Sequence, residues 1–248
     1  MTATLHRHTG WLLLLIVALG LNLRPALTAA GPLLAEIRAA TGIGFQGAAL
    51  LTALPFLCIG AVALALPWLS RGLSEHRGMV VGLGAIAAAS AWRWWLDGGP
   101  ALIMSALLAG FGVAIIQALM PGLIKRWFSG QVPMVTGLYS AALIAGGGAA
   151  AVLSPPVAAY LDDWRAGLGV WALPAVLALL VWWRVRPREM PAASAAAPVQ
   201  HFFTSRRGWL LAAYFGLING GYTSMAAWLP EQYRQLGWSA QDSGGMLV

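Results

Sequence analysis

Seven long apolar segments follow one another along the chain, with short polar loops between them. They cover residues 10–34, 47–69, 78–96, 101–124, 133–158, 166–183 and 208–230. Because a helix needs about 20 mostly apolar residues to cross a bilayer, this pattern predicts an all-α membrane protein with seven complete spans. An eighth apolar segment begins near Ala240 and reaches only Val248, so we expect further spans to follow it.

The basic residues set the expected orientation. With the N-terminus in the cytoplasm, ten of the fifteen lysines and arginines fall in cytoplasmic loops, as the positive-inside rule requires. They are Arg7, Arg71, Arg77, Lys125, Arg126, Arg184, Arg186, Arg188, Arg206 and Arg207. Most acidic residues fall on the outer side. We therefore predict a multi-pass protein of the cytoplasmic (inner) membrane with a cytoplasmic N-terminus.

The longest loop has the composition of a linker, with three prolines, a run of alanines and basic clusters at both ends. It follows the sixth apolar segment. Six spans, a cytoplasmic linker and more spans are the layout of a transporter built from two six-helix halves. We expect residues 1–183 to form the N-terminal half, residues 184–207 the linker and residues 208–248 the start of the C-terminal half.

Composition agrees with a membrane protein and excludes other classes. Hydrophobic residues make up 59% of the chain and charged residues 9%, whereas soluble domains carry about 25% charged residues. The net charge of +7 does not indicate a nucleic-acid partner, because the basic residues are spread over short loops. Membrane lipids are the expected surroundings. The single cysteine, Cys58, cannot form an intrachain disulfide, and the first apolar segment is too long for a cleaved signal peptide.

Arg24, in Asn22-Leu23-Arg24-Pro25, is the strongest candidate for a functional residue. It lies about 14 residues into the first segment, roughly 20 Å from the cytoplasmic edge at about 1.5 Å per residue. A charge at that depth is costly and marks a functional site by default. No acidic residue lies mid-segment to pair with it. Its partner is therefore an anionic or polar substrate group or a residue beyond this chain, or else its role is structural.

Pro25 should break the first span beside Arg24, because proline removes a backbone hydrogen bond and frees a carbonyl near Leu21. A broken helix at membrane depth is tolerated where it lines a cavity. Small and polar residues share one face of this span at helical spacing, and we expect that face to line a cavity: Gly20, Arg24, Thr28 and Gly31.

Other polar residues at membrane depth are Gln117 in the fourth segment and Asn219, Tyr222 and Thr223 in the seventh. Such groups either contact a substrate or hydrogen-bond one helix to another, and both alternatives stay open. The predicted substrate-binding set is Arg24, Asn22, Thr28, Gln117, Asn219 and Tyr222.

The fifth segment carries a face of small residues that we interpret as a packing surface, since small side chains let helices approach closely. Its members are Gly137, Ala141, Ala145 and Gly148. The run Gly146-Gly147-Gly148 is not a nucleotide loop, because no strand precedes it and it lies in an apolar segment.

Three arginines lie near the ends of spans. Arg93 falls among Trp92, Trp94 and Trp95, which is typical of a snorkelling arginine in an aromatic belt. Arg71 and Arg77 lie in the loop between the second and third segments. That loop is either a solvated basic loop or a gating contact.

Four stretches carry a family resemblance. They are Asn22-Leu23-Arg24-Pro25-Ala26-Leu27-Thr28, Gly31-Pro32-Leu33-Leu34, Leu50-Leu51-Thr52-Ala53-Leu54-Pro55 and Gln117-Ala118-Leu119-Met120-Pro121-Gly122-Leu123-Ile124-Lys125-Arg126. They resemble the cyanate permease and 2-nitroimidazole transporter family of the major facilitator superfamily. The resemblance implies a twelve-helix fold that moves a small solute by a rocker-switch mechanism. The loop from Arg71 to Arg77 is similar to a superfamily loop but lacks its usual aspartate.

The leading hypothesis is a secondary permease for a small anion or small polar solute such as cyanate, with Arg24 in its central site. We expect no cofactor and no metal site, and the sequence does not imply an oligomer. An enzyme would need a mid-span acid, base or nucleophile, whereas all four histidines fall in cytoplasmic segments. The alternative is a truncated, non-transporting membrane scaffold or sensor derived from such a transporter.

Overall fold

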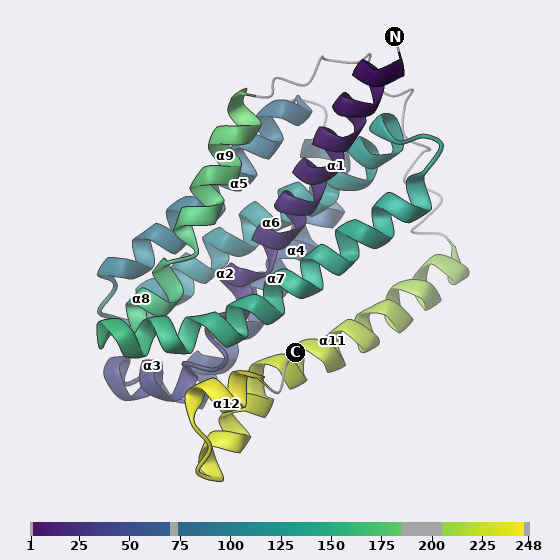
Figure 1. Cartoon of the computed structure of the whole chain (residues 1–248). Helices are drawn as coiled ribbons and strands as arrows, with labels where there is room; N and C mark the ends of the chain where they lie inside the picture. The colour runs from purple at the N-terminus through teal and green to yellow at the C-terminus, as the bar shows by residue number, and fades with distance from the viewer. Residues whose placement is uncertain (1, 70–73, 185–204, 246–248) are drawn as a thin grey trace.

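The computed structural model describes residues 2–69, 74–184 and 205–245, and these residues are almost entirely helical. The elements are α1 (Thr2–Leu23), α2 (Pro25–Thr28), α3 (Leu34–Thr41), α4 (Phe45–Leu69), α5 (Glu75–Trp92), η1 (Arg93–Trp95), α6 (Gly99–Trp127), α7 (Val132–Leu161), α8 (Trp164–Gly169), α9 (Ala172–Arg184), α11 (Arg206–Gln235) and α12 (Ala240–Gly245). In Figure 1 the helices α1, α4, α5, α6, α7 and α9 form one bundle, α11 lies beside it, and α1 begins at the end opposite α3 and α12. The predicted all-α architecture is confirmed. Most of the predicted linker lies outside the described residues.

Within the described residues, five helical segments are long and apolar enough to cross a membrane. They are Gly10–Thr28, Phe45–Ala65, Gly99–Trp127, Val132–Leu161 and Trp164–Arg184. The other two predicted spans correspond to α5 and α11, which are less apolar. α5 is 18 residues long and begins with Glu75-His76-Arg77, and α11 carries charges near both ends. Composition therefore supports five of the seven predicted spans, and membrane crossing by α5 and α11 stays a prediction.

α6 is the central helix of the bundle and packs against both α4 and α5. It approaches α5 so closely that a Cβ atom on Gly112 would lie 2.5 Å from the carbonyl oxygen of Gly82. Only glycine fits there without a shift of the backbone. Lipid provides no hydrophobic driving force between helices, so close packing of this kind is what holds a membrane bundle together.

The remaining helices cover this centre. α7 packs along α1 and α2, and α9 packs against α5 and α1. The core between them is apolar, with the side chains of Ile16, Leu19 and Trp182 fully buried. These contacts place the first span, which comprises α1 and α2, between α6, α7 and α9.

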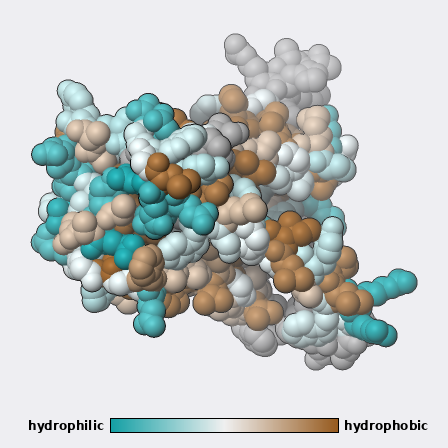
Figure 2. All heavy atoms as spheres, turned by 90° about the horizontal axis from the view of Figure 1, so that it is seen from below, coloured by the Kyte–Doolittle hydropathy of each residue, from teal (hydrophilic) through white to brown (hydrophobic). Residues whose placement is uncertain are grey.

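α11 lies along one side of the bundle and approaches the other helices at the end that carries α3 (Figure 1). Two ion pairs join α11 to α3 at that end. The Nη1 atom of Arg234 is 2.5 Å from Oε1 of Glu36, and Nη1 of Arg38 is 3.6 Å from Oε1 of Glu231. Figure 2, seen from this end, shows hydrophilic residues gathered over the bundle. Reciprocal charges therefore tie α11 to α3.

Candidate functional site

The first span is broken at Arg24, as predicted. α1 ends at Leu23 and α2 begins at Pro25, which has no N–H to donate to the carbonyl of Leu21. That carbonyl faces α7, where a Cβ atom on Gly146 would lie 2.2 Å from its oxygen. Glycine at this position lets the α7 backbone pack directly against the break.

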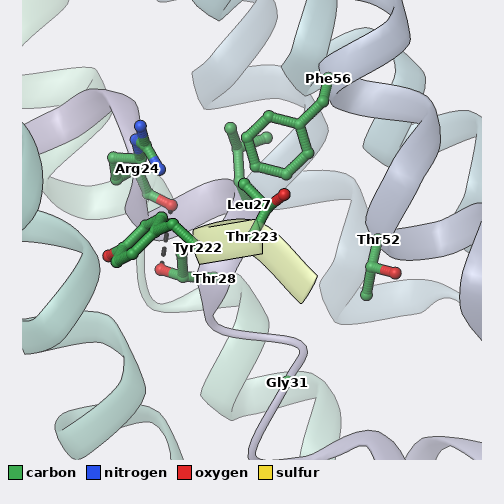
Figure 3. Close-up of a pocket in the computed structure, with 8 residues that line it drawn as sticks. All are labelled: Arg24, Leu27, Thr28, Gly31, Thr52, Phe56, Tyr222 and Thr223. Atoms are coloured by element: carbon green, nitrogen blue, oxygen red, sulfur yellow. Dashed lines mark hydrogen bonds between the residues drawn. The ribbon is translucent and has the colours of Figure 1, made fainter. Parts of the chain in front are cut away.

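A small, partly open pocket lies against the break, and its cavity volume is about 20 Å³. Its walls come from the first span, α4 and α11 (Figure 3). The lining residues are Arg24, Leu27, Thr28, Gly31, Thr52, Phe56, Tyr222 and Thr223. The structure thus brings together Arg24, Thr28 and Tyr222 from the predicted set. Of the three segments that carry the predicted set, the first and the seventh line the pocket, and the second span lines it in place of the fourth.

The guanidinium of Arg24 faces two aromatic rings (Figure 3). Its Cζ atom lies 5.9 Å from the ring centroid of Phe56 and 5.6 Å from that of Tyr222. Among the described residues, its buried Nε and Nη1 atoms have no hydrogen-bond partner and no carboxylate forms an ion pair with it. Aromatic rings attract a cation but leave its hydrogen-bond donors unsatisfied. The pocket wall therefore contains a positive group with two buried donors that lack a partner.

Thr28 ties the pocket wall to α7. Its hydroxyl oxygen is 3.1 Å from the carbonyl oxygen of Arg24 and 3.1 Å from that of Gly147. A hydroxyl has one hydrogen to donate, so it donates to one carbonyl at a time. A Cβ atom on Gly147 would lie 3.3 Å from Cβ of Arg24. The backbone of α7 therefore supports both polar residues of the first span.

Three residues of the predicted substrate-binding set do not line the pocket. Asn22 donates through Nδ2 to the carbonyl of Ala18, at 2.8 Å, and Asn219 donates to the carbonyl of Phe215, at 3.0 Å. Both bonds stay within one helix. Gln117 is half-buried on α6 and is also absent from the lining.

The interpretation of Arg93 as a snorkelling residue is wrong. Its side chain is 1% exposed, and it donates to the carbonyl of Ala26 and to the hydroxyl of Ser105. Trp95, two residues later, is 74% exposed. Consecutive residues of a tight helical turn point in different directions, so η1 directs Trp95 outward and Arg93 into the bundle.

The structure does not test the predicted gating role of Arg71 and Arg77. Arg71 lies outside the described residues. Arg77 is exposed in the first turn of α5, where its backbone N–H donates to the Ser74 hydroxyl at 3.4 Å. In the same turn Glu75 forms an ion pair with Arg126 of α6. A gating role for Arg71 and Arg77 stays a prediction.

The two pocket residues that α4 contributes, Thr52 and Phe56, were not predicted. They are four residues apart on α4, so both lie on the face that meets the first span. Thr52 could have been identified from the sequence, because it is a polar residue in an apolar segment. Phe56 could not, because aromatic residues are common in such segments.

The sequence of this chain matches a known protein family and several known transporters. The sequence profile of the Major Facilitator Superfamily matches residues 10–248. The cyanate transport protein CynX of Escherichia coli (strain K12) is 47% identical over 239 residues, which cover 96% of this chain and 62% of that protein. The 2-nitroimidazole transporter of the same organism is 30% identical over 240 residues, covering 93% and 59%. The chain spans about three-fifths of the length of these curated relatives.

Two solved structures share the fold at low sequence identity. The peptide transporter POT in complex with sulfate has a TM-score of 0.62 and 14% identity, and the match covers 86% of this chain and 45% of that one. Tetrameric PepTSo2 has a TM-score of 0.59 and 14% identity, with 90% and 50% covered. These two likenesses concern the fold alone.

Proposed function

Because this chain belongs to the Major Facilitator Superfamily, we propose that it acts as a secondary transporter of a small anion in the cytoplasmic membrane. One observation carries the proposal, the Arg24 guanidinium that faces the pocket without a described acidic partner. An intramembrane charge is costly unless something compensates it. A bound anion supplies that compensation, and it does so only while it occupies the pocket.

The donor geometry of arginine favours a linear or planar substrate. Its guanidinium presents N–H donors in a planar fork that matches two acceptor atoms at once. Cyanate is a linear anion, and a nitroimidazole is a planar ring with a nitro group. The relatives named for these solutes are 47% and 30% identical to this chain. We favour an anion such as cyanate because a neutral solute leaves the buried charge uncompensated.

The position of the pocket supports alternating access. Its walls belong to both predicted halves, with α2 and α4 from the first and α11 from the second. A solute held between two halves is exposed to either side in turn when the halves rock about it. With the N-terminus in the cytoplasm, the ion pairs between α3 and α11 lie at the outer end of the protein.

A non-transporting membrane scaffold or sensor derived from such a transporter is the second candidate. A sensor that binds the anion without moving it would present the same pocket.

Uptake by proteoliposomes separates the two candidates. Purified full-length protein is reconstituted, and entry of labelled cyanate is measured against liposomes that carry the same amount of the Arg24→Ala variant. A transporter gives saturable entry that the variant lacks. Binding without entry would support the sensor. If cyanate and other small anions neither bind to the protein nor enter the liposomes, the proposed function is contradicted.

A further inference from the structure

Arg93 is a fully buried charge outside the pocket. It begins η1 at the end of α5, and its side chain is 1% exposed. Among the described residues its hydrogen-bond partners are neutral, and no carboxylate forms an ion pair with it. A buried guanidinium without a counterion is expensive. Such a residue calls for a role that a neutral side chain could not fill.

Its first contact is with the broken part of the first span. The Nη1 atom of Arg93 donates to the carbonyl oxygen of Ala26 at 2.8 Å. Ala26 belongs to α2, which is four residues long, and carbonyls in the last turn of a helix lack partners within that helix. The next residue, Leu27, lines the pocket. The bond therefore holds the backbone of the first span at Ala26, between the pocket residues Arg24 and Leu27.

Its second contact anchors the arginine to the central helix. The Nε atom of Arg93 donates to the hydroxyl oxygen of Ser105 at 3.1 Å. That hydroxyl donates its own hydrogen to the carbonyl of Leu102 at 2.6 Å. Both residues lie on α6 and are buried. Arg93 thus bridges α2 and α6 with two donors of one rigid group.

We propose that Arg93 is a positioning residue for the substrate. Its side chain clamps the α2 segment against α6, so that Arg24 stays at the pocket. This inference rests on the proposed function. The planar fork of arginine donates in two directions at once, whereas lysine is a point charge and glutamine is shorter and neutral. Loss of the clamp lets α2 shift. Substrate affinity should then fall, while the movement of the two halves continues.

The test compares uptake kinetics of four variants in proteoliposomes that contain the full-length protein. Arg93→Gln removes the clamp and should raise the KM for cyanate by at least about tenfold, the scale of a charged hydrogen bond, with Vmax per transporter retained. Arg165→Gln removes another arginine at the same end of the bundle, bonded to Leu96 and Asp97, and should leave KM unchanged. Arg24→Lys, alone and combined with Arg93→Gln, completes a double-mutant cycle. If Arg93 acts through Arg24, the second substitution adds less than about twofold to KM.

Each outcome decides the inference. A fall in protein amount or melting temperature with an unchanged KM would make Arg93 purely structural and overturn it. Fully additive effects in the cycle would also overturn it, because they place Arg93 outside the Arg24 site. If Arg93→Gln fails to fold, Arg93→Lys decides, since it keeps one donor and should raise KM about threefold; an unchanged KM overturns the inference. Normal uptake by both Arg24→Lys and Arg24→Ala would instead make Arg24 structural, whereas an unmodified protein that neither binds nor takes up cyanate or another small anion would contradict the proposed function itself.

Discussion

Arg24 is the charged group of the pocket, and it is only partly exposed and has no ion-pair partner within the described residues. Phe56 and Tyr222 lie on two sides of the guanidinium, at 5.9 and 5.6 Å. Contact with an exposed or partly buried ring is worth about 0.5–2 kcal/mol, far less than the hydration that a buried charge loses. We propose that a ligand with acceptor atoms supplies the remainder.

Arg24→Lys should impair transport more than its retained charge suggests. Lysine is a compact point charge and loses the planar donor fork. We expect binding to weaken by about 1–3 kcal/mol, which is about ten- to a hundredfold in apparent affinity, and Arg24→Ala to be worse. The measurement is uptake across substrate concentrations, corrected for surface expression. Normal uptake by both variants would make Arg24 structural.

Arginines show what can be predicted at the scale of single residues. Arg24 stands out in the sequence because a charge deep in an apolar segment needs a reason. Arg93 looked ordinary because its neighbours are tryptophans, and the sequence does not say which way a residue at a helix end points. The difference lies in the turn of η1, which only the packed structure fixes.

At the scale of elements, the contact of α7 with the break in α1 depends on glycine. A Cβ atom on Gly146 would lie 2.2 Å from the carbonyl oxygen of Leu21, a backbone atom that cannot move aside. Gly146→Ala should therefore destabilise the protein by about 1–3 kcal/mol, the usual cost of overpacking. Thermal unfolding of the purified protein measures the effect.

Gly137 is the matched control on the same helix, because a Cβ atom there meets nothing within 4 Å. Gly137→Ala should be neutral or stabilise by up to about 1 kcal/mol, since alanine is the better helix former. Equal effects of the two substitutions would contradict the close approach of α7 to Leu21.

The packing face of α7 was predicted on the wrong side of the helix. The sequence suggested Gly137, Ala141, Ala145 and Gly148, whereas the structure buries Ala142, Gly146, Gly147 and Ala150. Small residues occur all around this helix, so composition does not fix its rotation. The carbonyl freed by Pro25 favours the side with Gly146, and that is a tertiary contact.

The ion pairs between α3 and α11 give a prediction for the same scale. Arg234→Glu should repel Glu36 and loosen the end that we predict to lie outside, whereas the added change Glu36→Arg should restore the pair with reversed charges. Exposed pairs are worth about 1 kcal/mol or less, so we expect a change of about two- to fivefold. The readout is labelling of a Gly31→Cys pocket residue by an impermeant thiol reagent outside, in a Cys58→Ser background. Equal labelling of all forms would show that the pairs do not hold this end closed.

At the scale of the whole molecule, the predicted orientation can be read by labelling. Gly98 and Asp162 follow η1 and α7 and lie in the loops that we assign to the outer side. Single cysteines at these positions should react with an impermeant reagent added outside intact cells, because ten of the fifteen basic residues favour a cytoplasmic N-terminus. Reaction only after the cytoplasmic side is opened would reverse the topology.

The general architecture was predictable because lipid imposes simple demands. Apolar length predicted the helices, and the motifs around Arg24 and Gln117 indicated the family to which the chain belongs. The partners of each helix were not predictable in the same way. From the sequence, Gln117 and Asn219 are expected at the same membrane depth as Arg24, yet neither lines the pocket. Helix packing at Gly82 and Gly110 decides that α4, rather than α6, contributes to the pocket.

The most direct test of the account is the shift in melting temperature that cyanate produces in the purified full-length protein. A ligand that binds only the folded state stabilises it in proportion to its occupancy. We expect cyanate to raise the melting temperature of the unmodified protein and to leave that of Arg24→Ala unchanged. An uncharged solute of similar size should shift neither. An equal rise for both proteins with cyanate would contradict the claim that Arg24 binds the transported anion.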